Sequence, residues 1–263
     1  MIVTILVMAA TVGLIILLTR GPAAGRANPS PPVDARRAWQ AVAVSLVGVA
    51  LVALLMAAFA TGREPGAATP VDDEDLGTAE LHCNLSDVIS TGLLGLLAAG
   101  PVLIYLGRRK ETAASVGWTR RGRGRAVGLG LAIGAFWSVV MILRSARPAA
   151  EILAGLGAAQ AWYFANHLVV GATEELVFRG FLQQRLEAWL GTWRGWLLAS
   201  LIMALAHWGQ RLTVMEMSPR DALLSSLYLI HHSALLGLVM LRSRNLAAPV
   251  IVHAFTNWLY VLS

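Results

Sequence analysis

Eight long apolar runs determine what this chain can fold into. Of its 263 residues, 57% are hydrophobic and only 14% are charged. The runs are continuous rather than alternating, which is typical of transmembrane helices, because about 20 helical residues cross the hydrocarbon layer of a bilayer. The sequence therefore predicts an all-α, polytopic transmembrane helical bundle. The eight expected spans are Ile2–Thr19, Trp39–Thr61, Val88–Gly107, Ala126–Leu143, Ala161–Gln184, Trp196–Trp208, Ala222–Leu241 and Leu246–Leu262.

The segments between the runs alternate in charge. Residues 20–38 hold four arginines and residues 108–125 hold seven Lys or Arg, whereas residues 62–87 hold seven of the fifteen acidic residues. The positive-inside rule predicts that the basic segments are cytoplasmic and the acidic segment external. The net charge of +6 is then explained by the basic cytoplasmic segments, which orient the protein in the bilayer. No basic stripe with interleaved aromatic residues is present, so we do not expect nucleic-acid binding.

Charged residues occur inside the fifth run, at Glu174, Glu175 and Arg179. A charge in the hydrocarbon layer costs on the order of 3 kcal/mol or more, so such residues usually mark a functional site. Glu175 and Arg179 are four residues apart and are expected to form an ion pair on one face of the helix. This pairing leaves Glu174, about 100° further round the helix, without a charged partner of its own.

Two later spans carry further polar residues, at His207 and at His253 and Asn257. A helical hairpin that turns near Gly191 would put Glu174 and His207 at the same height, each about 25 Å from the turn. His253 lies only about 13 Å from the turn expected at Arg244 and Asn245. For the three side chains to meet, the hairpin at Gly191 must therefore project further into the cytoplasm than that turn does. We expect the three side chains to surround one water-accessible hollow. A separation of Glu174 from both imidazoles by more than about 10 Å would exclude a shared hydrolytic centre.

These motifs carry a family resemblance. The pattern Glu-Glu-x-x-x-Arg at 174–179, a histidine that ends a span, and His-x-x-x-Asn at 253–257 resembles the CAAX-protease and bacteriocin-processing (CPBP, or Abi) intramembrane endopeptidases. The resemblance covers about residues 160–263. The family usually has phenylalanine four residues before the second-motif histidine, where this chain has Met203. Residues 1–150 match only as generic membrane spans. We therefore expect N-terminal membrane spans with cytoplasmic basic loops over residues 1–150 and a CPBP/Abi catalytic core over residues 151–263.

The resemblance also implies a mechanism. Glu174 would be the general base that activates water, and His207 would hold the same water. His253 and Asn257 would donate hydrogen bonds to the developing oxyanion, and such a donor is worth about 3 kcal/mol. Glu175, paired with Arg179, would orient the helix and tune Glu174. This mechanism needs no cofactor. An alternative is a zinc ion held by Glu174, His207 and His253, which has the ligand chemistry of a catalytic zinc site.

Three functions remain open on this evidence. The first is an intramembrane endopeptidase that acts on a membrane-associated or lipid-modified protein or peptide. The second is an ion-coupled transporter, because buried carboxylates also mark proton paths, although no inverted repeat is visible. The third is a non-catalytic immunity or scaffold protein on the same fold. The composition and short loops favour a bacterial cell membrane, where prenylated CAAX substrates are not expected.

Three other histidines receive structural interpretations. His167, two turns before Glu174, is expected to pack between helices or lie at the outer interface. His231 and His232 interrupt the seventh run, and a structural hydrogen bond to a neighbouring helix is favoured over a position in the substrate cavity.

Overall fold

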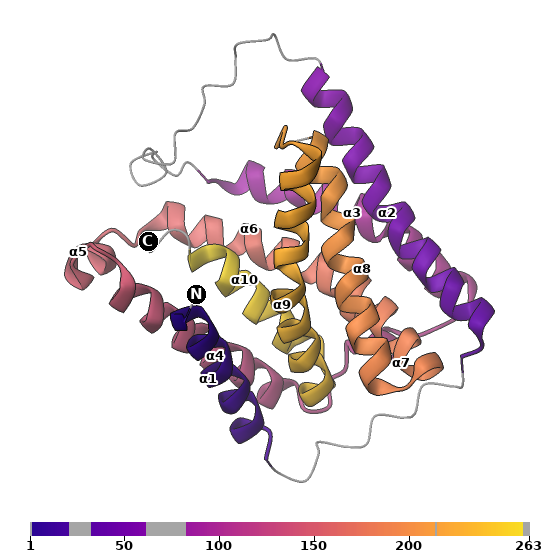
Figure 1. Ribbon diagram of the computed structural model, residues 1–263, viewed down its shortest axis with the longest axis horizontal. Helices are drawn as coiled ribbons and strands as arrows, with labels where there is room; N and C mark the ends of the chain where they lie inside the picture. The colour runs from indigo at the N-terminus through magenta and orange to yellow at the C-terminus, as the bar shows by residue number, and fades with distance from the viewer. Residues whose placement is uncertain (1, 21–32, 62–82, 214, 260–263) are drawn as a thin grey trace.

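The computed structural model describes residues 2–20, 33–61, 83–213 and 215–259 (Figure 1). Within these ranges the chain is helical almost throughout and contains no strand, which confirms the predicted all-α class. The predicted acidic segment 62–87 falls largely outside the described residues, as does most of the basic segment 20–38.

The helices are α1 (Ile2–Leu18), α2 (Ala35–Thr61), α3 (Leu85–Arg108), α4 (Arg123–Arg144), α5 (Ala149–Ala154), α6 (Ala158–Glu175), α7 (Gln184–Leu190), α8 (Thr192–Thr213), α9 (Pro219–Ser243) and α10 (Ala247–Trp258). A 3₁₀ turn, η2 (Ala113–Val116), follows α3, and a π-helical segment, η3 (Leu176–Gln183), joins α6 to α7.

Four of the described helices are long and apolar enough to cross a membrane. They contain the segments Ala35–Met56, Leu85–Arg108, Arg123–Arg144 and Pro219–Ser243. A helix also forms in each of the other four predicted spans, but these helices are shorter or carry charge. In the fifth predicted span, the charged side chains of Glu175 and Arg179 are buried and paired with each other inside the bundle.

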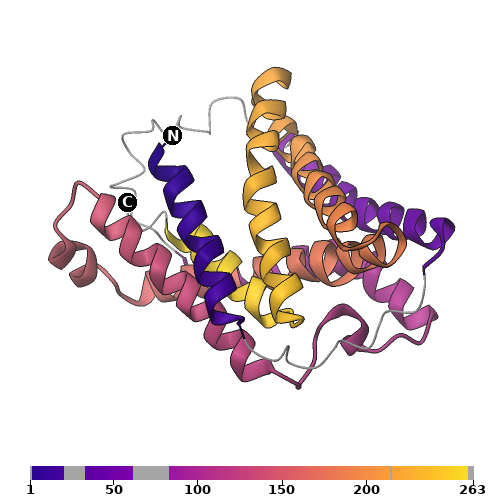
Figure 2. The same ribbon diagram turned by 60° about the horizontal axis from the view of Figure 1, so that its bottom comes forward.

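The α6 helix occupies the middle of the bundle (Figures 1 and 2). It packs against α3 on one side and against α10 on the other, while α10 also packs on α4. The α8 and α9 helices lie side by side, and α2 packs across α3 and α8. The end of α6 therefore meets helices from both halves of the chain.

Two glycines allow the close packing around α6. The chain reverses at Gly191, where φ is +83°, so that α8 returns along α7 and η3. This confirms the predicted hairpin. At Gly171, an added Cβ would lie 3.0 Å from the carbonyl oxygen of Val250 and 3.4 Å from the Cβ of His253. Only a residue without a side chain lets α10 approach α6 this closely.

Candidate active site

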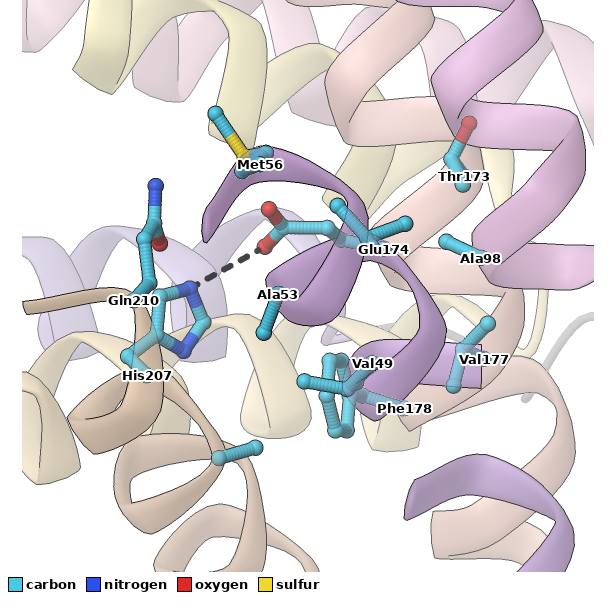
Figure 3. Close-up of a pocket in the computed structure, with 12 residues that line it drawn as sticks. Val49, Ala53, Met56, Ala98, Thr173, Glu174, Val177, Phe178, His207 and Gln210 are labelled. Atoms are coloured by element: carbon cyan, nitrogen blue, oxygen red, sulfur yellow. Dashed lines mark ion pairs between the residues drawn. The ribbon is translucent and has the colours of Figure 1, made fainter. Parts of the chain in front are cut away.

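Glu174 lies at the end of α6 between two histidines from different helices. Its Oε2 atom is 3.7 Å from Nε2 of His207 on α8 and 3.9 Å from Nε2 of His253 on α10. Figure 3 shows the carboxylate of Glu174 pointing toward the His207 ring. The side chain of Glu174 is 29% exposed, so water can reach it. Both distances are well below the separation of about 10 Å that would exclude a shared hydrolytic centre.

The neighbouring carboxylate, Glu175, is completely buried and has two partners. Arg179 Nε lies 3.1 Å from its Oε2 atom, as the sequence spacing predicts. His253 Nδ1 lies 2.8 Å from its Oε1 atom, a contact that the sequence did not reveal. Arg179 also donates from Nη2 to the carbonyl and hydroxyl oxygens of Ser233, at 3.1 Å each. The buried charges of α6 are therefore tied to both α9 and α10.

The helix changes its winding immediately after the two carboxylates. Residues Leu176–Gln183 form a π-helix, and every residue from Val177 to Gln183 is buried. Such segments are rare and are frequently found at functional sites. The sequence did not predict this segment, because a short π-helix within a largely apolar run does not change the α-helical spacing of apolar residues enough to be noticed.

The hydrogen bonds of the two histidines set the chemistry of the nitrogens that face Glu174. His207 Nδ1 lies 2.9 Å from the carbonyl oxygen of Met203, one turn earlier, and can only donate to it. His253 Nδ1 donates to the carboxylate of Glu175 in the same way. In a neutral ring the remaining Nε2 atom is an acceptor, and it becomes a donor when the ring is protonated.

The remaining predicted residues take different positions. Asn257, one turn after His253, is partly buried and makes no hydrogen bond within the described ranges. Its place at the oxyanion stays a prediction. His167 packs edge-on against Tyr163 with ring centroids 4.4 Å apart, and its ring nitrogens have no hydrogen-bond partner among the described residues. The packing position expected for His167 is therefore the one observed.

A cavity of about 140 Å³ opens beside Glu174 and His207 (Figure 3). Four apolar residues of α2 form one wall, and α3, α6, η3 and α8 complete it. The sequence did not indicate this contribution of α2, because residues 1–150 matched the family only as generic spans. The lining residues are Val49, Val52, Ala53, Met56, Ala98, Thr173, Glu174, Val177, Phe178, Ala206, His207 and Gln210.

The zinc alternative stays a hypothesis. Among the described residues, no group of three or more His, Cys, Asp or Glu side chains is arranged to hold a metal ion. Zinc ligands lie about 2.0–2.2 Å from the metal and surround it. The Nδ1 atoms of both candidate imidazoles are hydrogen-bonded and their Nε2 atoms face the same oxygen of Glu174, so Nε2 is the atom that each ring would offer to a metal ion.

Comparison with known protein families finds a match over the C-terminal helices. Residues 157–259 match the family model described as type II CAAX prenyl endopeptidase Rce1-like. No curated protein and no solved structure matches the chain significantly. The matched region runs from the start of α6 to the end of α10 and contains Glu174, His207 and His253. The family resemblance drawn from the three motifs is thereby confirmed, and residues 157–259 match the CAAX-protease family.

Proposed function

We propose that this protein is an intramembrane endopeptidase in which Glu174 activates water to hydrolyse a peptide bond of a membrane-associated or lipid-modified substrate. The observation that carries the proposal is the approach of two imidazoles to one oxygen of a half-buried carboxylate at the edge of an apolar cavity. The match to a protease family supports the reaction class. A helical bundle with four long apolar spans supports a substrate that arrives through the bilayer.

Glu174 and His207 would bind the attacking water together. Glu174 Oε2 accepts one hydrogen bond from the water, and Nε2 of His207 accepts the other. As the water oxygen bonds to the carbonyl carbon of the substrate, Glu174 takes its proton. It then passes that proton to the amine as the C–N bond breaks, so the carboxylate is regenerated.

His253 would stabilise the oxyanion in this mechanism. Its Nε2 atom can donate a hydrogen bond only when the ring carries a second proton, because Nδ1 already donates to Glu175. The adjacent charge of Glu175 favours this protonated ring. Glu175 therefore has two tasks: it neutralises Arg179 and it prepares His253 as a donor.

The cavity would hold an apolar group of the substrate next to the bond that is cut. Its volume, about 140 Å³, is close to the roughly 150 Å³ of an engineered apolar cavity that binds benzene. Eight of its twelve lining residues are Val, Ala, Met or Phe, and Glu174 and His207 are the two ionisable ones. This arrangement suits an apolar side chain whose peptide bond faces the carboxylate.

The test is cleavage by the full chain in proteoliposomes. The probe is a quenched fluorescent peptide that carries an S-farnesylated cysteine three residues from its C-terminus, together with an unprenylated apolar version. Wild-type protein should cleave at least one probe, and Glu174→Gln should be inserted and folded but inactive. The matched control, Glu151→Gln, changes an exposed carboxylate of α5 and should keep full activity.

Cleavage that persists in Glu174→Gln would overturn the proposal. The same vesicles can report the two competing functions. Proton flux that depends on Glu174 would favour a transporter. In cells, complementation by Glu174→Gln would favour a non-catalytic immunity or scaffold role, and a comparison of membrane-protein termini would identify natural substrates.

A further inference from the structure

We propose that His232 of α9 is a further active-site residue, which donates a hydrogen bond to the substrate carbonyl alongside His253. The inference rests on the proposed peptidase function and adds a residue outside the three motifs that carry the family resemblance. The ring of His232 meets the ring of His253 edge-on, with centroids 5.9 Å apart and planes at 87°. A third helix, α9, therefore brings an imidazole to the site, next to α8 and α10 (Figure 1).

The position of His232 is fixed by the buried charges of α6. Arg179 donates to both the carbonyl and the hydroxyl of Ser233, the residue that follows His232. Arg179 pairs with Glu175, and Glu175 in turn binds His253. Ser233, Arg179, Glu175, His253 and His232 therefore contact one another in that order, and the chain itself joins His232 to Ser233. The same network that orients His253 thus also holds the α9 backbone beside it.

His232 has no other evident partner. Its side chain is partly buried and makes no hydrogen bond to another residue within the described ranges, which overturns the expected structural hydrogen bond to a neighbouring helix. Its ring nitrogens are not among the buried polar atoms that lack a partner, unlike both ring nitrogens of His167, so water or a ligand can reach them. The neighbouring His231 differs, because its ring packs edge-on against the exposed ring of Tyr228, with centroids 4.4 Å apart.

Among the described residues, the site offers the carbonyl oxygen few donors besides Nε2 of His253. His253 uses Nδ1 for Glu175 and turns Nε2 toward Glu174, and Asn257 makes no hydrogen bond to this cluster. Arg179 and a protonated His253 disfavour a further positive charge nearby, so His232 would act as a neutral imidazole. A neutral imidazole still carries one N–H group. This group could donate to the oxyanion from the α9 side.

The experiment measures kcat and KM for the cleaved probe with full-length protein in proteoliposomes. His232→Phe keeps a flat ring against His253 but removes the donor. We expect kcat to fall roughly 10- to 100-fold, somewhat less than the roughly 100- to 1000-fold loss on removal of one side-chain donor from a well-formed oxyanion hole. KM should change by less than about threefold, because the bond forms in the transition state. The control, His231→Phe, should behave like wild type.

A second pair of variants tests the same point if His232→Phe does not fold. His232→Asn and His232→Leu have nearly the same shape, and only Asn retains an N–H donor. Asn should be about tenfold more active than Leu if the donor matters. Equal kcat values for this pair, or wild-type kcat in a folded His232→Phe, would overturn the role of His232 and leave the proposed function intact. Absence of Glu174-dependent cleavage by the wild-type chain would overturn both.

Discussion

His253 and Glu175 are joined by a 2.8 Å hydrogen bond between Nδ1 and Oε1, and both side chains are buried. The bond turns the other ring nitrogen, Nε2, toward Glu174. Two adjacent carboxylates on one helix thus have separate tasks. Glu175 orients an imidazole from inside the bundle, and Glu174, which is partly exposed, is left to meet water and substrate.

Glu175→Gln should lower both activity and stability. It keeps the shape of the side chain but leaves Arg179 without a charged partner in a fully buried position, which typically costs about 3–5 kcal/mol. The double variant Glu175→Gln/Arg179→Met removes both charges and should recover most of the stability, because no lone buried charge remains. Cleavage should stay low in both variants, since neither contains the carboxylate that prepares His253. Thermal unfolding and probe cleavage separate the two effects.

Activity that returned with stability in the double variant would contradict this role of Glu175. It would show that Glu175 acts only as the counter-charge of Arg179.

Filling the cavity beside Glu174 should weaken substrate binding. Ala53→Trp places a large ring among residues that line the cavity. We expect KM for an apolar probe to rise about tenfold, which corresponds to roughly 1.4 kcal/mol of binding free energy. Leu54→Trp is the matched control, because Leu54 is the next residue of α2 and is 68% exposed. Equal KM values for the two variants would show that the substrate does not use this cavity.

Gly171→Ala should reduce activity by separating α6 from α10. The new Cβ would lie 3.0 Å from the carbonyl oxygen of Val250 and 3.4 Å from the Cβ of His253, so α10 must shift by a few tenths of an ångström and we expect the His253–Glu175 hydrogen bond to lengthen. A displacement of about 1 Å at a catalytic group can cost up to 100-fold in rate. By contrast, an added Cβ at Gly128 of α4 meets nothing within 4 Å.

Gly128→Ala is therefore expected to leave activity unchanged and to stabilise the helix by about 0.5–1 kcal/mol. Rate and melting temperature measured together decide the comparison. The prediction fails if both alanine variants change activity equally.

Glu187 should make stability depend on pH. This residue lies on α7, outside the four helices that are long enough to span a membrane, and burial raises its pKa despite its contacts with Gln183 and Arg244. Because the folded protein holds the proton more tightly than the unfolded chain, this group stabilises the fold below the ordinary carboxyl pKa. That contribution is lost as the pH rises through the raised pKa.

The measurement is the melting temperature of wild type minus that of Glu187→Gln, followed from pH 4 to about pH 8. The difference should decrease as the pH rises, since glutamine does not titrate. A difference that is constant or increases with pH would contradict the prediction.

The sequence was sufficient for the parts of the site that depend on one helix or one hairpin. The Glu175–Arg179 pair follows from four-residue spacing, and the equal heights of Glu174 and His207 follow from a hairpin at Gly191. Contacts between distant helices were harder to predict. The bond from His253 to Glu175 depends on how closely α10 approaches Gly171, and helical periodicity does not report that distance.

Residues that carry no motif were missed for a related reason. The α2 wall of the cavity consists of Val, Ala and Met, and such residues look the same whether they face lipid or substrate. His232 was noticed in the sequence, but its neighbour could not be named until α9 was placed against α10. In each case the missing information was the orientation of one helix about its axis.

The π-helical segment Leu176–Gln183 determines how α7 is oriented relative to the two carboxylates at the end of α6. Its i→i+5 hydrogen bonds place more residues in each turn than the α-helices on either side. If the same eight residues wound as regular α-helix, they would turn further in total and would rotate α7 relative to Glu174 and Glu175. Gln183 and Glu187 would then leave Gly237 and Arg244, or the carboxylates would leave their histidines. The π-helical winding therefore lets one continuous helical stretch satisfy both sets of contacts at once.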